Sequence, residues 1–154
     1  MKKAWIVLTV ICTVCLALPA HAIVRSNDVG IGIVLGEPSG LVGQFFMSQN
    51  SLLDVTLAWS LDENVDLLVA VDYQIYNNLG DAPPEWSWYY GLGGFVGFPE
   101  NDDGILGVRV PLGIAYSFPR SIVDLWLEIA PGLEIIPDTD AHVMGGIGVT
   151  FWIQ

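Results

Sequence analysis

Apolar and polar side chains alternate along most of the chain. The pattern is clearest at 122–136, where the odd-numbered positions are apolar and the even-numbered ones include Asp124, Glu128 and Glu134. An alternation of period two is typical of a β-strand whose two faces meet different surroundings. The segment is longer than the ~5–6 residues of most globular strands and suits the ~9–11 residues of a strand that crosses a bilayer in a tilted barrel.

Seven further segments show the same alternation and are separated by turn-forming residues. The predicted strands are 29–36, 41–48, 52–61, 65–76, 86–98, 105–118, 122–136 and 142–153. Glycine, proline, asparagine and aspartate are frequent in the connections between them, as in tight turns. Pro111 and Pro131 fall inside predicted strands, where a missing backbone donor predicts a bulge or a shift of register.

The composition indicates which face of the strands points inward. The chain is 53% hydrophobic and only 14% charged, whereas roughly 25–35% of the surface residues of a soluble domain are charged. The polar parity is mostly glycine, alanine, serine and threonine with a few carboxylates, which suits a narrow packed interior, and the apolar parity suits lipid. These features predict an all-β fold, an eight-stranded antiparallel up-and-down transmembrane β-barrel. A periplasmic lipid- or ligand-binding barrel with its apolar face inside is the alternative.

The first 22 residues have the organisation of a secretory signal peptide. Two lysines precede an apolar run at 4–18, and small residues end the segment at Ala22. Cleavage there would leave 23–154 as a single barrel domain, remove both cysteines, and leave three arginines against 17 acidic residues, a formal charge of −14. This charge argues against nucleic acid as a partner. We expect a location in the bacterial outer membrane.

The predicted barrel resembles the small eight-stranded outer-membrane barrels of the OmpA/OmpX type. More narrowly, LGEPSGL (35–41), GVRVPLGIAYSF (107–118) and DLWLEIAPGLEIIP (124–137) are similar to segments of an uncharacterised family of short bacterial envelope barrel proteins. The resemblance implies membrane lipid as the surroundings and insertion by the barrel-assembly machinery. It supplies no catalytic residues.

The two ends of the predicted barrel differ in chemistry. With both termini on the periplasmic side, the odd-numbered connections face outward, and each contains acidic residues: Glu37; Asp62 and Glu63; Glu100, Asp102 and Asp103; Asp138 and Asp140. Most aromatic residues of the strands collect toward the other end, as in the aromatic girdles of membrane barrels. Glu100, Asp102 and Asp103 are candidate ligands of a divalent cation such as Ca²⁺. A solvated acidic turn is the simpler interpretation of the same residues.

A second candidate site lies at the predicted outer rim. His142 is the only histidine after residue 22 and follows Asp138 and Asp140, so it could act as the general base of a hydrolase. A hydrated loop that contains a histidine explains the same residues more simply.

Charged residues on the lumen parity predict an internal network of Arg109, Glu128, Glu134, Asp54, Asp72 and Asp124. A three-residue turn at 62–64 would set Asp54 directly opposite Asp72, whereas a register shifted by two residues would separate them. A two-residue turn at 119–120 would set Arg109 opposite Ala130 and predicts an ion pair with Glu128 or Glu134, because a buried guanidinium requires a carboxylate partner.

The leading functional prediction is a non-enzymatic outer-membrane barrel with a structural, adhesive or cation-binding role in the envelope. No open pore is expected, because eight strands leave an interior that side chains fill. No cofactor is expected apart from a divalent cation. The rim hydrolase and the periplasmic binding barrel are the alternatives, and the oligomeric state is open.

Overall fold

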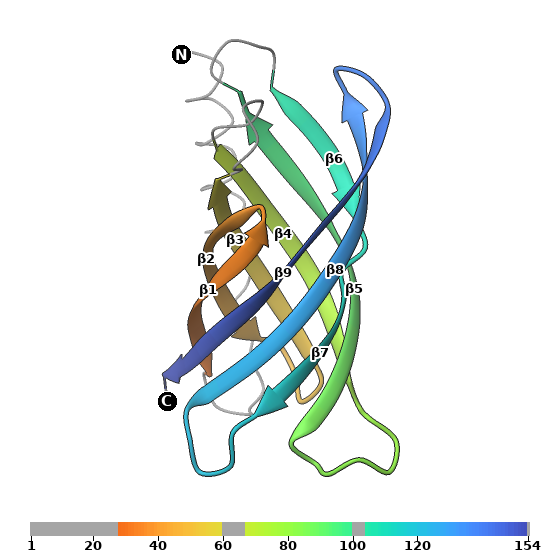
Figure 1. The fold of residues 1–154 in the computed structure, drawn as a ribbon. Coiled ribbons are helices and arrows are strands. Elements are labelled where there is room, and N and C mark those ends of the chain that lie inside the picture. Colours follow the sequence, from red (N-terminus) through yellow and green to blue (C-terminus); the bar gives the residue numbers. More distant parts are fainter. Residues whose placement is uncertain (1–27, 60–66, 100–103, 154) are drawn as a thin grey trace.

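The computed structural model describes residues 28–59, 67–99 and 104–153, which form one antiparallel sheet (Figure 1). Its strands are β1 (Val29–Glu37), β2 (Ser39–Phe46), β3 (Ser51–Trp59), β4 (Leu67–Asn78), β5 (Trp86–Phe98), β6 (Ile105–Arg109), β7 (Leu112–Ser117), β8 (Val123–Ile136) and β9 (Asp140–Ile153). In these ranges we find no helix with the length and apolar character needed to cross a membrane.

The strand pairings close on themselves. Successive strands pair from β1 to β5, and β8 pairs with β9, which returns to β1 from Val29↔Ile153 to Glu37↔Gly145. Both β6 and β7 lie between β5 and β8, so these two short strands together complete one wall of the ring. The predicted eight-stranded up-and-down barrel is therefore confirmed, with its sixth strand in two parts.

Pro111 explains why the sixth strand of the barrel is divided into β6 and β7. Proline cannot donate to the ladder, yet the register is the same on both sides of it, with Arg109 opposite Gly132 in β8 and Leu112 opposite Ile129. The Pro111 carbonyl still accepts from the amide of Gly91 at 2.9 Å.

The predicted register shift at the two prolines was wrong. β8 runs through Pro131 with its pairing to β9 unbroken, and the irregularity lies instead between Leu106 and Gly107. The ladder tolerates Pro131 because the carbonyl of this proline still accepts from Val110 at 2.9 Å.

The turn between β7 and β8 also differs from the prediction. Phe118 donates its amide to the carbonyl of Val123 at 3.1 Å, and Ser121 donates to Phe118 at 3.1 Å, which leaves four residues in the turn instead of two. Arg120 has φ 62° there. The register moves by two residues, so Arg109 lies opposite Gly132 and the predicted position opposite Ala130 was wrong.

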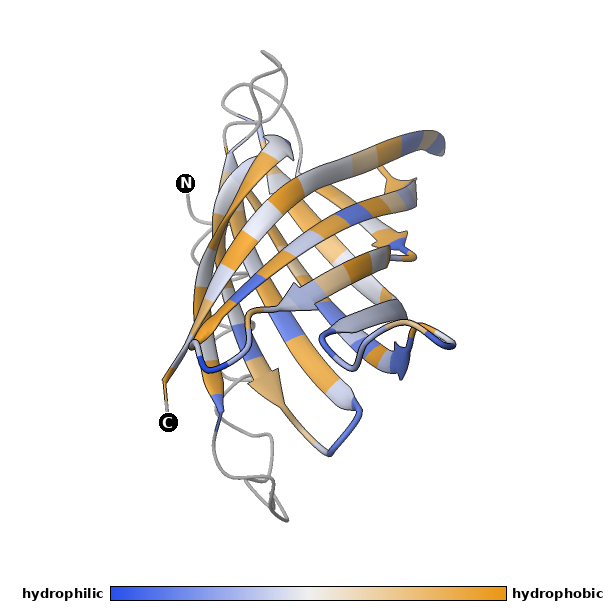
Figure 2. Ribbon diagram, turned by 60° about the horizontal axis from the view of Figure 1, so that its bottom comes forward, coloured by the Kyte–Doolittle hydropathy of each residue, from blue (hydrophilic) through white to orange (hydrophobic). Residues whose placement is uncertain are grey.

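The two faces of the sheet separate by polarity as predicted. Apolar residues follow every second position along the strands (Figure 2), and the outward ones are widely exposed, for example Leu92 at 66% and Val143 at 71%. The inward positions include buried Asp72 and Gln74 beside Ala70. The barrel thus has an apolar exterior, and its interior holds buried polar side chains together with two apolar clusters, one around Trp126 and one around Phe95.

The connections gather at two ends, which we name for their chemistry. The aromatic end holds the β2–β3, β4–β5 and β7–β8 connections and the end of β9, at the bottom of Figure 1. Outward-facing ring pairs occur there at Trp86–Tyr116, Trp88–Tyr90 and Tyr116–Phe118, with centroids 4.9–5.5 Å apart. The acidic end holds the β1–β2 and β8–β9 connections. Its predicted residues Asp62, Glu63, Glu100, Asp102 and Asp103 lie outside the described residues.

Candidate functional site in the barrel lumen

An ion pair between Arg109 and Asp72 occupies the middle of the lumen. Nε of Arg109 lies 3.0 Å from both carboxylate oxygens of Asp72, and Nη2 also bonds Oδ2. The arginine is 5% exposed and the aspartate fully buried. A guanidinium matches a carboxylate with several parallel hydrogen bonds, which fixes both side chains in place.

A glycine makes room for this pair. Asp72 in β4 lies opposite Gly93 in β5, and Gly93 lies opposite Arg109 in β6, so the three residues form one row across the wall. A methyl group at Gly93 would overlap Oδ1 of Asp72. The missing side chain therefore lets aspartate and arginine meet over the strand between them.

Glu128 is a second carboxylate beside the arginine. Its Oε1 lies 3.9 Å from Nη2 of Arg109, while Oε2 accepts from the Tyr89 hydroxyl at 2.8 Å and from Nε2 of Gln74 at 3.3 Å. Strands β4, β5, β6 and β8 thus meet around one guanidinium. Of the two partners predicted for Arg109, the structure brings Glu128 near it.

Asp54 belongs to a neighbouring polar chain. It lies opposite Asp72, the register expected from the sequence, and accepts from Gln44 and Thr56 at 2.9 Å each. Gln44 in turn accepts from Thr150 at 3.0 Å, and Thr150 accepts from the indole of Trp126 at 3.0 Å. This chain crosses the lumen from β8 through β9 and β2 to β3.

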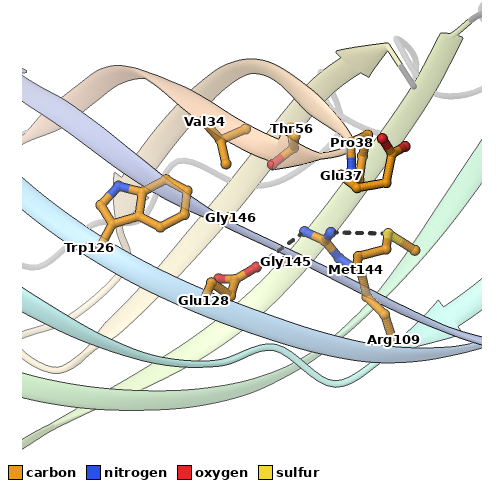
Figure 3. A pocket seen from close by; sticks show the side chains of 10 residues that line it. All are labelled: Val34, Glu37, Pro38, Thr56, Arg109, Trp126, Glu128, Met144, Gly145 and Gly146. Atoms are coloured by element: carbon orange, nitrogen blue, oxygen red, sulfur yellow. Dashed lines mark hydrogen bonds and ion pairs between the residues drawn. The ribbon is translucent and has the colours of Figure 1, made fainter. Parts of the chain in front are cut away.

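A cavity of about 20 Å³ lies between the two groups, which is room for roughly one water molecule. Figure 3 shows its walls, with Arg109 and Glu128 on one side and Thr56 and Trp126 among the residues around it. The full lining is Val34, Glu37, Pro38, Thr56, Arg109, Trp126, Glu128, Met144, Gly145 and Gly146. A space of this size holds no organic substrate.

The remaining predicted lumen acids lie toward the two ends. Oε1 of Glu134 lies 3.9 Å from Nδ1 of His142 near the acidic end. Asp124 accepts from the indole of Trp152 at 2.8 Å near the aromatic end. The structure therefore does not bring Glu134 or Asp124 to Arg109.

The sequence placed Asp72 in the lumen network but did not predict it as the ion-pair partner of Arg109. The prediction considered the strand that follows Arg109 along the chain, whereas Asp72 lies two strands away in the other direction. Glycine at alternate lumen positions of β5, Gly91 and Gly93, was the available signal, since it leaves the space through which such a pair can form.

The predicted rim hydrolase is not assembled in the described residues. His142 has Glu134 as its neighbouring carboxylate and packs edge-on against Phe95 at 5.1 Å, while its Nδ1 has no hydrogen-bond partner in the part of the chain that the structure describes. Asp140 accepts instead from the amide of Ala141 at 3.0 Å, and Asp138 is exposed in the turn before β9.

No metal-binding cluster is found either, because in ranges 28–59, 67–99 and 104–153 no three His, Cys, Asp or Glu side chains are grouped to hold an ion. Glu100, Asp102 and Asp103 lie outside these ranges, so their cation site stays a prediction.

A closed antiparallel ring with an apolar exterior and an ion-pair network inside it defines a small barrel of the outer-membrane type. The chain is similar to the N-terminal β-barrel domain of OprF from Pseudomonas aeruginosa, with a TM-score of 0.67 and 14% identity over 82% of this chain and 98% of that chain. It is also similar to a de novo designed transmembrane β-barrel, with a TM-score of 0.56 and 16% identity over 84% of this chain and 98% of that one.

These likenesses show the fold, and the predicted OmpA-like small barrel is confirmed. No protein-family model matches the chain, and no curated protein matches it in sequence. The narrower resemblance to short envelope proteins stays a prediction.

Proposed function

We propose that this protein is a non-enzymatic outer-membrane β-barrel with a structural role in the bacterial envelope. It is exported by its first 22 residues and inserted by the barrel-assembly machinery, with the acidic end outside the cell. The observation that carries the proposal is the band of exposed apolar side chains around a closed ring, including Leu92, Leu127 and Ile147. Water would make such a surface costly, at ~25 cal/mol for each Å² of apolar area.

The ion-pair network in the lumen favours a structural role over transport. Arg109, Asp72 and Glu128 meet at the middle of the barrel, and the adjoining cavity is about 20 Å³. A solute would have to break several charge-assisted hydrogen bonds to pass. A periplasmic binding barrel needs an apolar pocket inside, whereas the lumen side chains of this barrel include the buried polar residues Gln44, Asp54, Thr56, Asp72, Gln74, Arg109 and Thr150.

Fractionation of cells that express the full chain tests the proposal. We expect the mature protein in the outer-membrane fraction, released by detergent and migrating differently on a gel before and after boiling. Leu92→Arg, in the middle of the apolar band, should reduce insertion because a cation at the bilayer centre costs ~2–4 kcal/mol. Ile136→Arg, at the acidic end, is the matched control and should insert normally. Recovery of the mature protein in the soluble periplasm without detergent would refute the proposal.

A further inference from the structure

Strand β9 extends beyond its neighbour β1. The pairing between them ends at Glu37↔Gly145, whereas β9 begins at Asp140 and pairs with β8 as far as Glu134↔Asp140. Among the described residues, 140–144 are therefore paired on one side only. Figure 1 shows the β8–β9 hairpin rising well above the β1–β2 turn. In the part of the chain that the structure describes, the barrel wall therefore has a notch above the end of β1, bounded by the edge of β9 at 140–144.

The direction of the backbone groups follows from the other end of β9. Trp152 donates its amide to the carbonyl of Ile122, on the β8 side, at 2.7 Å. In an antiparallel strand the amide and carbonyl of one residue point to the same neighbour, and successive residues alternate. Since the β8–β9 register is unbroken, the even-numbered residues face β8. Ala141 and Val143 therefore direct their amides and carbonyls into the notch.

One contact supports this assignment independently. The amide of Ala141 donates to Oδ1 of the Asp140 side chain at 3.0 Å, as expected for a strand amide that has no ladder partner. Unpaired strand edges are templates for a further strand. The Asp140 side chain accepts from only one amide of this edge, that of Ala141. The backbone carbonyl of an incoming strand can replace the carboxylate as the acceptor.

The acidic residues around this strand edge favour a positively charged partner. Glu134 lies directly opposite Asp140, Glu37 ends the neighbouring strand, and Asp138 is exposed in the turn. Positions 134–144 contain three acidic residues and no lysine or arginine. A second copy of this chain would bring like charges together, whereas an extended cationic segment is complementary.

We propose that the edge at 140–144 binds an extended lysine- or arginine-rich segment of a partner protein by strand addition. The segment continues the sheet in the notch above β1, with its backbone bonded to Ala141 and Val143 and its cationic side chains toward Asp140 and Glu134. Main-chain bonds provide affinity in this mode of recognition, and alternate side chains provide specificity. The proposal rests on the proposed function in placing the acidic end outside the cell.

The test uses the folded barrel in detergent micelles and a fluorescein-labelled six-residue peptide of alternating lysine and threonine. We expect saturable binding by fluorescence anisotropy, weakened by salt, with slower hydrogen exchange at the Ala141 and Val143 amides. Three peptides or variants should each weaken binding about tenfold or more: a peptide N-methylated on alternate residues, Val143→Pro, and Asp140→Asn. Val143→Thr keeps the amide and is the matched control.

The gel shift on heating, measured for each variant, shows that the barrel itself is intact. The proline variant removes an amide that faces away from β8, so the ladder to β8 is retained. Equal affinity for the N-methylated and unmodified peptides would overturn the proposal, because it would show attraction between charges without strand addition. Absence of binding to a barrel that retains its gel shift would also overturn it and would leave the proposed membrane location untouched.

Discussion

Arg109 and Asp72 lie on strands that are not neighbours, yet they form the central ion pair of the lumen. Gly93 separates them in the intervening strand and carries no side chain to block them. The pair thus ties β4 to β6 across β5 in addition to the backbone ladder. The guanidinium therefore links two strands that the backbone ladder joins only through β5.

Replacing Arg109 by alanine should destabilise the barrel strongly. Asp72 and Glu128 would remain buried without their cation, and breaking a buried pair by removing one partner costs ~3–5 kcal/mol. The free energy of unfolding, measured by urea titration in lipid vesicles, should fall by about this amount.

The matched control for this prediction is Arg120→Ala, at the exposed β7–β8 turn, which should change stability by less than ~0.5 kcal/mol. A double variant with Arg109→Met and Asp72→Asn should recover part of the loss, because it no longer buries an unpaired carboxylate at 72. An unchanged urea midpoint for Arg109→Ala would show that the side chain is hydrated in solution.

Gly93→Ala should separate the same ion pair without removing either charge. The added methyl group would overlap the Asp72 carboxylate and also the backbone carbonyl of Val71, and overpacking of an interior costs ~1–3 kcal/mol. Gly43→Ala is the control, since a methyl group there meets nothing closer than the Phe45 ring at 3.6 Å. Equal unfolding midpoints for the two alanine variants would contradict the row of Asp72, Gly93 and Arg109.

The alternation of side chains was enough to predict the barrel and the orientation of its faces. Asp54, Asp72 and Arg109 are buried on the lumen face predicted for them, because a strand has only two faces and the composition of each is distinct. The sequence allowed two registers for the β3–β4 hairpin, and the structure has the one that sets Asp54 opposite Asp72. The register across the β7–β8 turn did not follow, because it depends on turn length, and the chain around Pro119 and Arg120 is compatible with a turn of two residues or four.

The partner of Arg109 was missed for a related reason. Pairing arguments from sequence reach the adjacent hairpin, whereas side chains inside a narrow barrel can cross a glycine to the second strand. The unequal heights of β1 and β9 were equally hidden, because they depend on how the strands are staggered when the ring closes. The ion pair across β5 and the step between β1 and β9 both depend on how the sheet closes into a barrel, and the sequence of one hairpin does not specify this.

The acidic connection at 100–103 should bind a divalent cation if the cation-binding role is correct. Glu100, Asp102 and Asp103 supply the oxygen ligands that Ca²⁺ prefers. Isothermal titration of the folded barrel with CaCl₂ should give a saturable heat that is lost in the triple variant Glu100→Gln, Asp102→Asn and Asp103→Asn. A barrel that gives the same heat after this exchange binds the ion elsewhere or only through its net charge.

The hydroxyl of Tyr89 should contribute measurably to the stability of the lumen. It donates to Oε2 of Glu128 at 2.8 Å, and the tyrosine is 2% exposed. Tyr89→Phe keeps the ring and removes one hydrogen bond to a buried carboxylate, so the free energy of unfolding should fall by ~1–3 kcal/mol.

The adjacent residue provides the control, because Tyr90 points outward and is 41% exposed. Tyr90→Phe, which removes the same atom from the lipid-facing side, should change stability by less than ~0.5 kcal/mol. If the two phenylalanine variants unfold at the same urea concentration, Glu128 does not depend on Tyr89, and the network of β4, β5, β6 and β8 around Arg109 is looser than its distances indicate.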